Sequence, residues 1–191
     1  VMGVGPVLSW GKEKKSEFVS RGGDKLHHFV ESKSISIENK CCMDIGISTG
    51  GFTDVLLRNN ALHVLGVDVA YGLLDYQLRK NQKLSLLERT NARYITKKEI
   101  SEIISNHHLN IEDISLVTID ISFISVFKVL PNLIPLLRKD CEYIILIKPQ
   151  FESEKHMVDE GGVLSNPEYI KETLRNVETQ ISENNCQILN S

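Results

Sequence analysis

From about Lys40 onward the chain alternates short apolar runs with longer amphipathic segments, and this pattern restricts its possible folds most strongly. Strands are expected at the apolar runs KCCMDI, HVLGVDV, LSLLE, ISLVTID, EYIILI and the start of CQILNS. Helices are expected between them, at 51–58, 73–79, 97–107, 126–137 and 167–183. Apolar strands separated by helices are typical of a parallel sheet covered on both faces. The sequence therefore predicts an α/β fold with a doubly wound, mostly parallel sheet.

The overall composition fits one globular domain and carries no general signature of nucleic-acid binding. The 191 residues are 41% apolar and 25% charged, which is enough to bury a full core. Because the formal net charge is −3, RNA binding would require a local basic patch. No apolar stretch approaches the ~20 residues that span a bilayer, so we expect no membrane partner.

The four cysteines favour structural thiols over a metal site. They form no CxxC pair, and no Cys/His cluster has the spacing of zinc ligands. Cys41, Cys42 and Cys141 lie in apolar, strand-like runs and are expected to be buried thiols. The sequence predicts no metal and a reducing, cytoplasmic location.

Charged residues gather where the predicted strands end, namely Asp44, Asp68, Glu88, Asp120 and Lys148. Ligands of doubly wound sheets bind beyond the carboxyl ends of the strands. Four acids and one lysine at that edge indicate a binding site, because a packed core alone would not select them.

The first strand runs into a glycine-rich turn, DIGISTGGF. Gly46, Gly50 and Gly51 allow the backbone to turn sharply and to approach a ligand closely. The spacing matches neither GxGxxG nor a P-loop, so the turn alone is weak evidence of a ligand, and a tight strand-to-helix turn is the alternative interpretation.

Asp68 makes a nucleoside ligand the better interpretation of this turn. An acid at the end of the second strand can accept hydrogen bonds from ribose hydroxyls and repels a 2′-phosphate. S-adenosylmethionine fits these features, with Asp44 near its amino group and Asn91 near its adenine. The expected cofactor contacts are Asp44, Gly46, Ser48, Thr49, Gly50, Gly51, Phe52, Asp68, Val69, Asn91, Ala92 and Asp120.

Two further charged features remain open to more than one interpretation. Asp120 and Lys148 end neighbouring strands, so their side chains should meet, either as a structural salt bridge or as a catalytic pair. A lysine amine in such a position can take a proton from a hydroxyl. Arg21 and Lys25, in SRGGDKL, form a flexible basic lead into a short helix, and taken alone this segment is better explained as a solvated helix start.

Seven motifs occur together and in order: VSRGGDKL, DIGISTGGFTDVLL, VDVAYGLL, ERTNAR, TIDISFIS, LIKPQFE and EGGVLSNPE. With these motifs the chain resembles the TlyA or hemolysin A-like family. Members of that family are 2′-O-ribose methyltransferases of ribosomal RNA, related to the FtsJ type. The resemblance covers about residues 18–177. It implies a Rossmann-like class I S-adenosylmethionine-dependent methyltransferase.

The resemblance also implies roles for individual residues. The methyl donor is S-adenosyl-L-methionine and the acceptor is a cytidine ribose hydroxyl in ribosomal RNA. Lys25, Asp120 and Lys148 match three members of a Lys-Asp-Lys-Glu tetrad. Lys148 would lie against the 2′-hydroxyl, Asp120 would hold Lys148, and Lys25 and Arg21 would contact RNA.

The chain departs from the family pattern at both ends. The glutamate of the tetrad, in a GN-x-E segment, has no match, and residues 1–17 do not resemble the family's S4-type RNA-binding domain. We therefore expect residues 1–17 to be a linker or tag remnant. Residues 18–191 are expected to be an FtsJ-like methyltransferase domain truncated at its C-terminus, and poor at engaging ribosomal RNA.

Two other functions compete with RNA methylation. The hemolysin name suggests a cytolysin, which the lack of a membrane-spanning or signal segment opposes. A nucleotide-binding Rossmann module without methyl transfer would not require a lysine at the end of the fifth strand.

Overall fold

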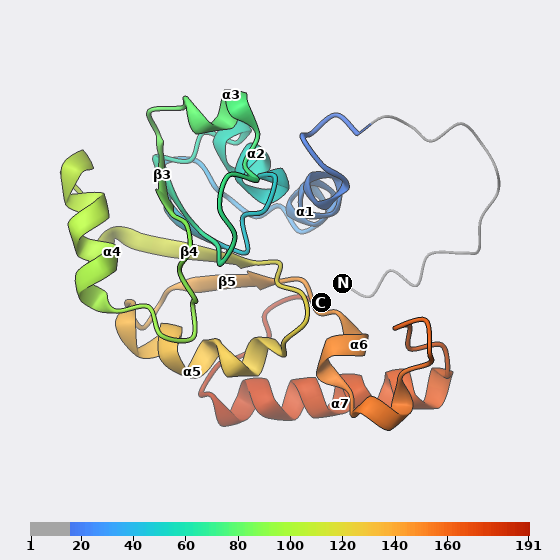
Figure 1. Cartoon of the computed structure of the whole chain (residues 1–191). Coiled ribbons are helices and arrows are strands. Elements are labelled where there is room, and N and C mark those ends of the chain that lie inside the picture. Colours follow the sequence, from blue (N-terminus) through green and yellow to red (C-terminus); the bar gives the residue numbers. More distant parts are fainter. Residues whose placement is uncertain (1–15) are drawn as a thin grey trace.

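The computed structural model describes residues 16–191 and shows a twisted parallel sheet between helices (Figure 1). The strands are β1 (Cys41–Ile45), β2 (His63–Val67), β3 (Leu84–Leu87), β4 (Ile114–Ile119) and β5 (Glu142–Ile145). Their order is β3-β2-β1-β4-β5, and every neighbouring pair is parallel. The order reverses between β1 and β4, which confirms the doubly wound α/β fold.

The helices follow the predicted alternation, with some differences in their bounds. They are α1 (Arg21–Ser32), α2 (Gly51–Arg58), α3 (Tyr76–Arg79), α4 (Lys97–Ile104), α5 (Leu130–Leu133), α6 (Pro149–Glu152) and α7 (Pro167–Glu183). Short 3₁₀ turns are η1 (Ser105–His107), η2 (Ile111–Asp113), η3 (Val126–Lys128), η4 (Ile134–Leu136) and η5 (Lys155–Met157).

Alternate residues of each central strand face opposite layers of helices. Cys42, Val64 and Leu116 pack with buried residues of α1 and α2 on one face of the sheet. Met43, Leu65 and Val117 pack with α4 and α5 on the other. All six side chains are fully buried, so the strands contain no polar alternation.

Two predicted helices differ from the structure for local chemical reasons. The helix expected at 73–79 begins only at Tyr76, because the Asp75 side chain caps it by accepting from the N–H groups of Gln77 and Leu78. The helix expected at 126–137 is divided into η3, α5 and η4. Pro131 and Pro135 interrupt it, since proline has no backbone N–H to donate.

The predicted sixth strand is wrong. Residues 186–191 have no regular structure, and residues 187–191 are exposed. A strand is stabilised by pairing, and this segment does not pair with β5; its Lys33–Ser191 contact joins a side chain to a carbonyl. Cys141 is also less buried than expected, whereas Cys41 and Cys42 are core residues.

The expected linker at 1–17 lies almost wholly outside the described residues. Within residues 16–191, no helix is long and apolar enough to cross a membrane.

Candidate active site

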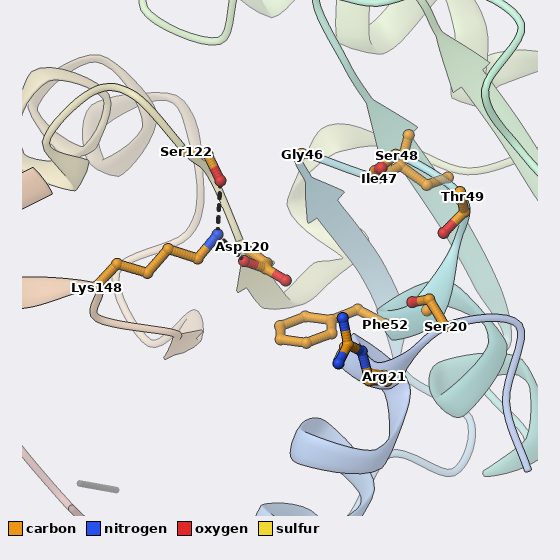
Figure 2. A pocket seen from close by; sticks show the side chains of 12 residues that line it. Ser20, Arg21, Gly46, Ile47, Ser48, Thr49, Phe52, Asp120, Ser122 and Lys148 are labelled. Atoms are coloured by element: carbon orange, nitrogen blue, oxygen red, sulfur yellow. Dashed lines mark hydrogen bonds and ion pairs between the residues drawn. The ribbon is translucent and has the colours of Figure 1, made fainter. Parts of the chain in front are cut away.

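A cavity of about 330 Å³ opens at the carboxyl ends of β1 and β4, where the strand order reverses (Figure 2). Its walls come from four segments that are far apart in the chain. They contribute Ser20, Arg21, Gly22, Gly46, Ile47, Ser48, Thr49, Gly51, Phe52, Asp120, Ser122 and Lys148. Sheets of this topology bind their ligands at this position.

The glycine loop forms one wall because it can pass very close to the end of β4. Gly46 has φ = +83°, and a Cβ there would lie 2.5 Å from the carbonyl oxygen of Asp120. Its N–H donates to the Val67 carbonyl at 2.8 Å, which holds the loop against β2. The loop then leads into the first turn of α2, whose N–H groups lack partners within the helix.

The segment that was expected to be a flexible basic lead is already helical. Arg21, Gly22, Gly23 and Lys25 lie in the first turns of α1. α1 packs so closely on α2 that a Cβ at Gly23 would lie 2.9 Å from the Gly51 carbonyl oxygen. This contact brings Ser20, Arg21 and Gly22 to the cavity, while Lys25 remains exposed on α1 and does not line it.

Asp120 and Lys148 meet at the cavity, as their positions at neighbouring strand ends predict. Lys148 Nζ forms an ion pair with Asp120 Oδ1 at 2.6 Å and donates to Ser122 Oγ at 2.8 Å (Figure 2). The two charged side chains retain 22% and 24% exposure, so a ligand in the cavity can reach them. Lys148 lies three residues beyond β5, as the N-cap of α6, and Pro149 starts that turn.

Asp44 lies beneath the cavity rather than in its wall. It is 1% exposed, and its two oxygens accept from Thr53 Oγ1 at 2.7 Å and Thr118 Oγ1 at 2.8 Å. Burial raises the pKa of Asp44 to about 6, against the opposing effect of the two hydroxyl donors. In this position Asp44 ties α2 to β1 and β4, and contact with a cofactor amino group remains a prediction.

Asp68 supports the glycine loop from the end of β2. Its carboxylate accepts from the Ser48 and Ala70 N–H groups, each at 2.8 Å. Thr90 N–H donates to the Asp68 carbonyl, so the loops after β2 and β3 lie side by side. Carboxylate oxygens have further lone pairs, and Asp68 is only partly buried, so it can still accept from ribose hydroxyls.

The carboxylate of Glu88, the remaining strand-end acid, is engaged by hydrogen bonds within the protein. It accepts two hydrogen bonds from the Arg79 guanidinium, at 2.6 and 3.0 Å, and one from the Gly72 N–H. The hydrogen bond from Arg79 is the main reason that the pKa of Glu88 is lowered. Glu88 therefore holds α3 and the loop after β2 in place.

The structure thus gathers most of the predicted site residues but not all of them. Those that were predicted and line the cavity are Arg21, Gly46, Ser48, Thr49, Gly51, Phe52, Asp120 and Lys148. Those that do not line it are Lys25, Asp44, Gly50, Asp68, Val69, Asn91 and Ala92. Within the latter group, Val69 and Asn91 are exposed on the loops beside Asp68, while Ala92 is buried.

Sequence reasoning missed four residues that line the cavity, namely Ser20, Gly22, Ile47 and Ser122. Ser122 is the most informative omission, because it is the second partner of Lys148. Its place two residues after Asp120, in the same loop, was the available signal. Its contact with Lys148 nevertheless depends on how the loop turns after β4.

Comparisons with known proteins bear on the family and the fold of the chain. Residues 18–189 match the family described as FtsJ-like methyltransferase. The chain is 40% identical over 156 residues to the "16S/23S rRNA (cytidine-2'-O)-methyltransferase TlyA" of Mycobacterium tuberculosis, covering 82% of this chain and 54% of that protein. The chain spans 53% to 65% of the length of the curated relatives it matches.

Solved structures extend the comparison. A "putative hemolysin" from Streptococcus thermophilus has a TM-score of 0.80 and 32% identity, covering 91% of this chain and 59% of that one. An S-adenosylmethionine-dependent methyltransferase from Mesorhizobium loti, 11% identical, shares the fold alone, with a TM-score of 0.50 over 70% of this chain and 58% of that one. The resemblance to the TlyA group is confirmed, and this chain belongs to the FtsJ-like methyltransferase family.

Proposed function

We propose that this domain transfers a methyl group from S-adenosylmethionine to a ribose 2′-hydroxyl of ribosomal RNA. The observation that carries the proposal is the Lys148–Asp120 ion pair, which faces a cavity beside the glycine loop at the topological switch point. A purely structural salt bridge has no need of a cavity beside it. Membership of a methyltransferase family supports the same reaction.

The residues around the cavity fit S-adenosylmethionine. The volume of about 330 Å³ lies within the range of small-molecule sites. The backbone from Gly46 to Gly51 would lie along the methionine part, and Asp68 would accept from the ribose hydroxyls. Val69, Asn91 and Ala92 would border the adenine. When bound, this cofactor supplies an electrophilic methyl group.

Lys148 and its partners would act on the acceptor hydroxyl. An ammonium group has three N–H donors, and Asp120 and Ser122 engage two of them. The third is available to hold the 2′-oxygen beside the cavity. A Lys148 amine that has lost a proton to solvent would take the hydroxyl proton as a general base. Asp120 and Ser122 would keep Nζ in place in both states.

We assign the RNA contacts to α1. Arg21 lines the cavity, and Lys25 is exposed one turn further along the same helix. Both would neutralise phosphates of the RNA backbone near the target nucleotide. The Mycobacterium tuberculosis relative is named for cytidine, and we propose cytidine here as well. Ribosomal RNA as substrate and free cysteines support a cytoplasmic location.

Replacing Lys148 tests the proposal directly. In the full-length protein, Lys148→Ala should lower methyl transfer to ribosomal subunits by about 10²-fold or more, since it removes the group that holds and deprotonates the hydroxyl. Affinity for S-adenosylmethionine, measured by calorimetry, should change little. Lys139→Ala, which removes an exposed lysine before β5, is the matched control and should retain full activity. Full methyl transfer by Lys148→Ala would refute the assigned role.

A further inference from the structure

Two segments beside the cavity contact each other at both ends and in the middle. The first is the loop of residues 120–126 after β4, and the second is the turn of residues 148–152 after β5. Lys148 contacts Asp120 and Ser122 at one end of the junction. The Phe123 and Phe151 rings meet in the middle, with centroids 5.5 Å apart. Glu152 makes the contact at the far end.

Glu152 accepts a hydrogen bond from a backbone group that would otherwise lack a partner. Val126 N–H donates to Glu152 Oε1 at 2.9 Å. Val126 is 2% exposed and begins η3, so its N–H has no acceptor within the 3₁₀ turn. Leaving a buried N–H without an acceptor is unfavourable, which favours keeping this contact.

Lys148 and Glu152 are also coupled through their own turn. Phe151 N–H donates to the Lys148 carbonyl at 2.8 Å and Ser153 N–H to the Pro149 carbonyl at 3.0 Å, closing the short helix α6. The two charged residues stand at opposite ends of this turn, and both reach the same loop. Anchoring the loop at Val126 therefore restricts where Ser122 and Asp120 can lie relative to Lys148.

We propose that Glu152 is a positioning residue for methyl transfer, acting through the Val126 N–H on the loop that carries Asp120 and Ser122. This inference rests on the proposed function. The relevant property of Glu152 is its acceptor oxygen rather than its charge. Its other carboxylate oxygen, Oε2, is buried and has no hydrogen-bond partner among the described residues, so the structure shows this carboxylate acting as the acceptor of Val126 N–H.

Two substitutions in the full-length protein distinguish the role of the Glu152 acceptor oxygen from the role of its negative charge. Glu152→Gln keeps a carbonyl oxygen for Val126 N–H and should retain kcat within a fewfold of the wild type. Glu152→Ala removes the acceptor and should lower kcat on the order of tenfold to a hundredfold, because misplacement of reacting groups is costly. The KM for ribosomal subunits and the affinity for S-adenosylmethionine should stay near wild-type values in both variants.

Glu99→Ala is the matched control, because Glu99 Oε2 likewise accepts a backbone N–H, that of Thr96, at the start of α4. It should leave kcat unchanged. A wild-type kcat in Glu152→Ala, or equal losses in the Ala and Gln variants, would overturn the positioning role. A wild-type protein that transfers no methyl group would instead refute the proposed function itself.

Discussion

At the scale of single residues, two buried titratable groups are expected to give opposite pH dependences of stability. Asp44 has a pKa raised from 3.8 to about 6, mainly by burial. The folded protein therefore holds this proton more tightly than the unfolded chain does. The resulting stabilisation is present below pH 3.8 and is lost as the pH rises through about 6, and it corresponds to about 3 kcal/mol.

Asp44→Asn tests this assignment, because the amide cannot ionise. We expect the free energy of unfolding of the variant to decline less than that of the wild type between pH 4 and 7. Urea titrations at a series of pH values measure the difference. Parallel curves for the two proteins would show that Asp44 does not titrate in this range.

His63 should have the opposite effect. It is 3% exposed, pairs with Ser85 Oγ at 2.9 Å and packs against the tilted ring of His107, with ring centroids 4.2 Å apart. Burial, and then the neighbouring His107, lower the pKa of His63 from 6.5 to about 4. Between pH 6.5 and about 4 the His63 side chain is protonated in the unfolded chain but largely neutral in the folded protein. The free energy of unfolding therefore decreases as the pH falls from 6.5 toward 4.

His63→Gln should remove this acid-sensitive part of the stability curve, since glutamine does not titrate and can still pair with Ser85. The same urea titrations, compared between pH 5 and 7, provide the measurement. An unchanged slope in the variant would contradict the assignment to His63.

At the scale of elements, the contact of α1 with α2 decides whether α1 reaches the site. Alanine has a higher helix propensity than glycine and usually stabilises a helix by up to about 1 kcal/mol relative to glycine. At Gly23, however, an added Cβ would lie 2.5 Å from Phe18 Cβ and 2.9 Å from the Gly51 carbonyl oxygen. The helices would have to separate, so packing should outweigh helix propensity.

Gly23→Ala should therefore lower the free energy of unfolding by about 1–3 kcal/mol. It should also weaken binding of S-adenosylmethionine, because Ser20 and Arg21 would move away from the cavity. Gly161→Ala, where an added Cβ meets no atom within 4 Å, is the control and should have little effect. A more stable Gly23→Ala protein would show that helix propensity dominates.

At the scale of the whole molecule, the cavity joins segments from residue 20 to residue 148, so ligand binding should stabilise the entire fold. S-adenosylmethionine at about a hundred times its Kd should raise the free energy of unfolding by about 3 kcal/mol. NAD should not, because the glycine loop lacks the dinucleotide spacing. Urea unfolding with each ligand provides the test. Equal stabilisation by NAD would favour a general nucleotide-binding module.

The extent of successful prediction differs between the fold and the site. Five strands, the parallel sheet and the bounds of α2 and α7 could be predicted, because apolar periodicity and helix caps act within a few residues of each other. The sixth strand could not be excluded from CQILNS alone, since an apolar run becomes a strand only where it has a partner.

Sequence pattern was sufficient to place Asp120 and Lys148 at one edge of the sheet, because parallel strands bring their carboxyl ends together. It could not show that Asp44 turns inward to Thr53 and Thr118, or that Ser122 and Glu152 join the Lys148 neighbourhood. Those contacts depend on loop paths and side-chain directions. Packing between segments distant in the chain determines the loop paths and the side-chain directions. A local sequence pattern therefore cannot predict them.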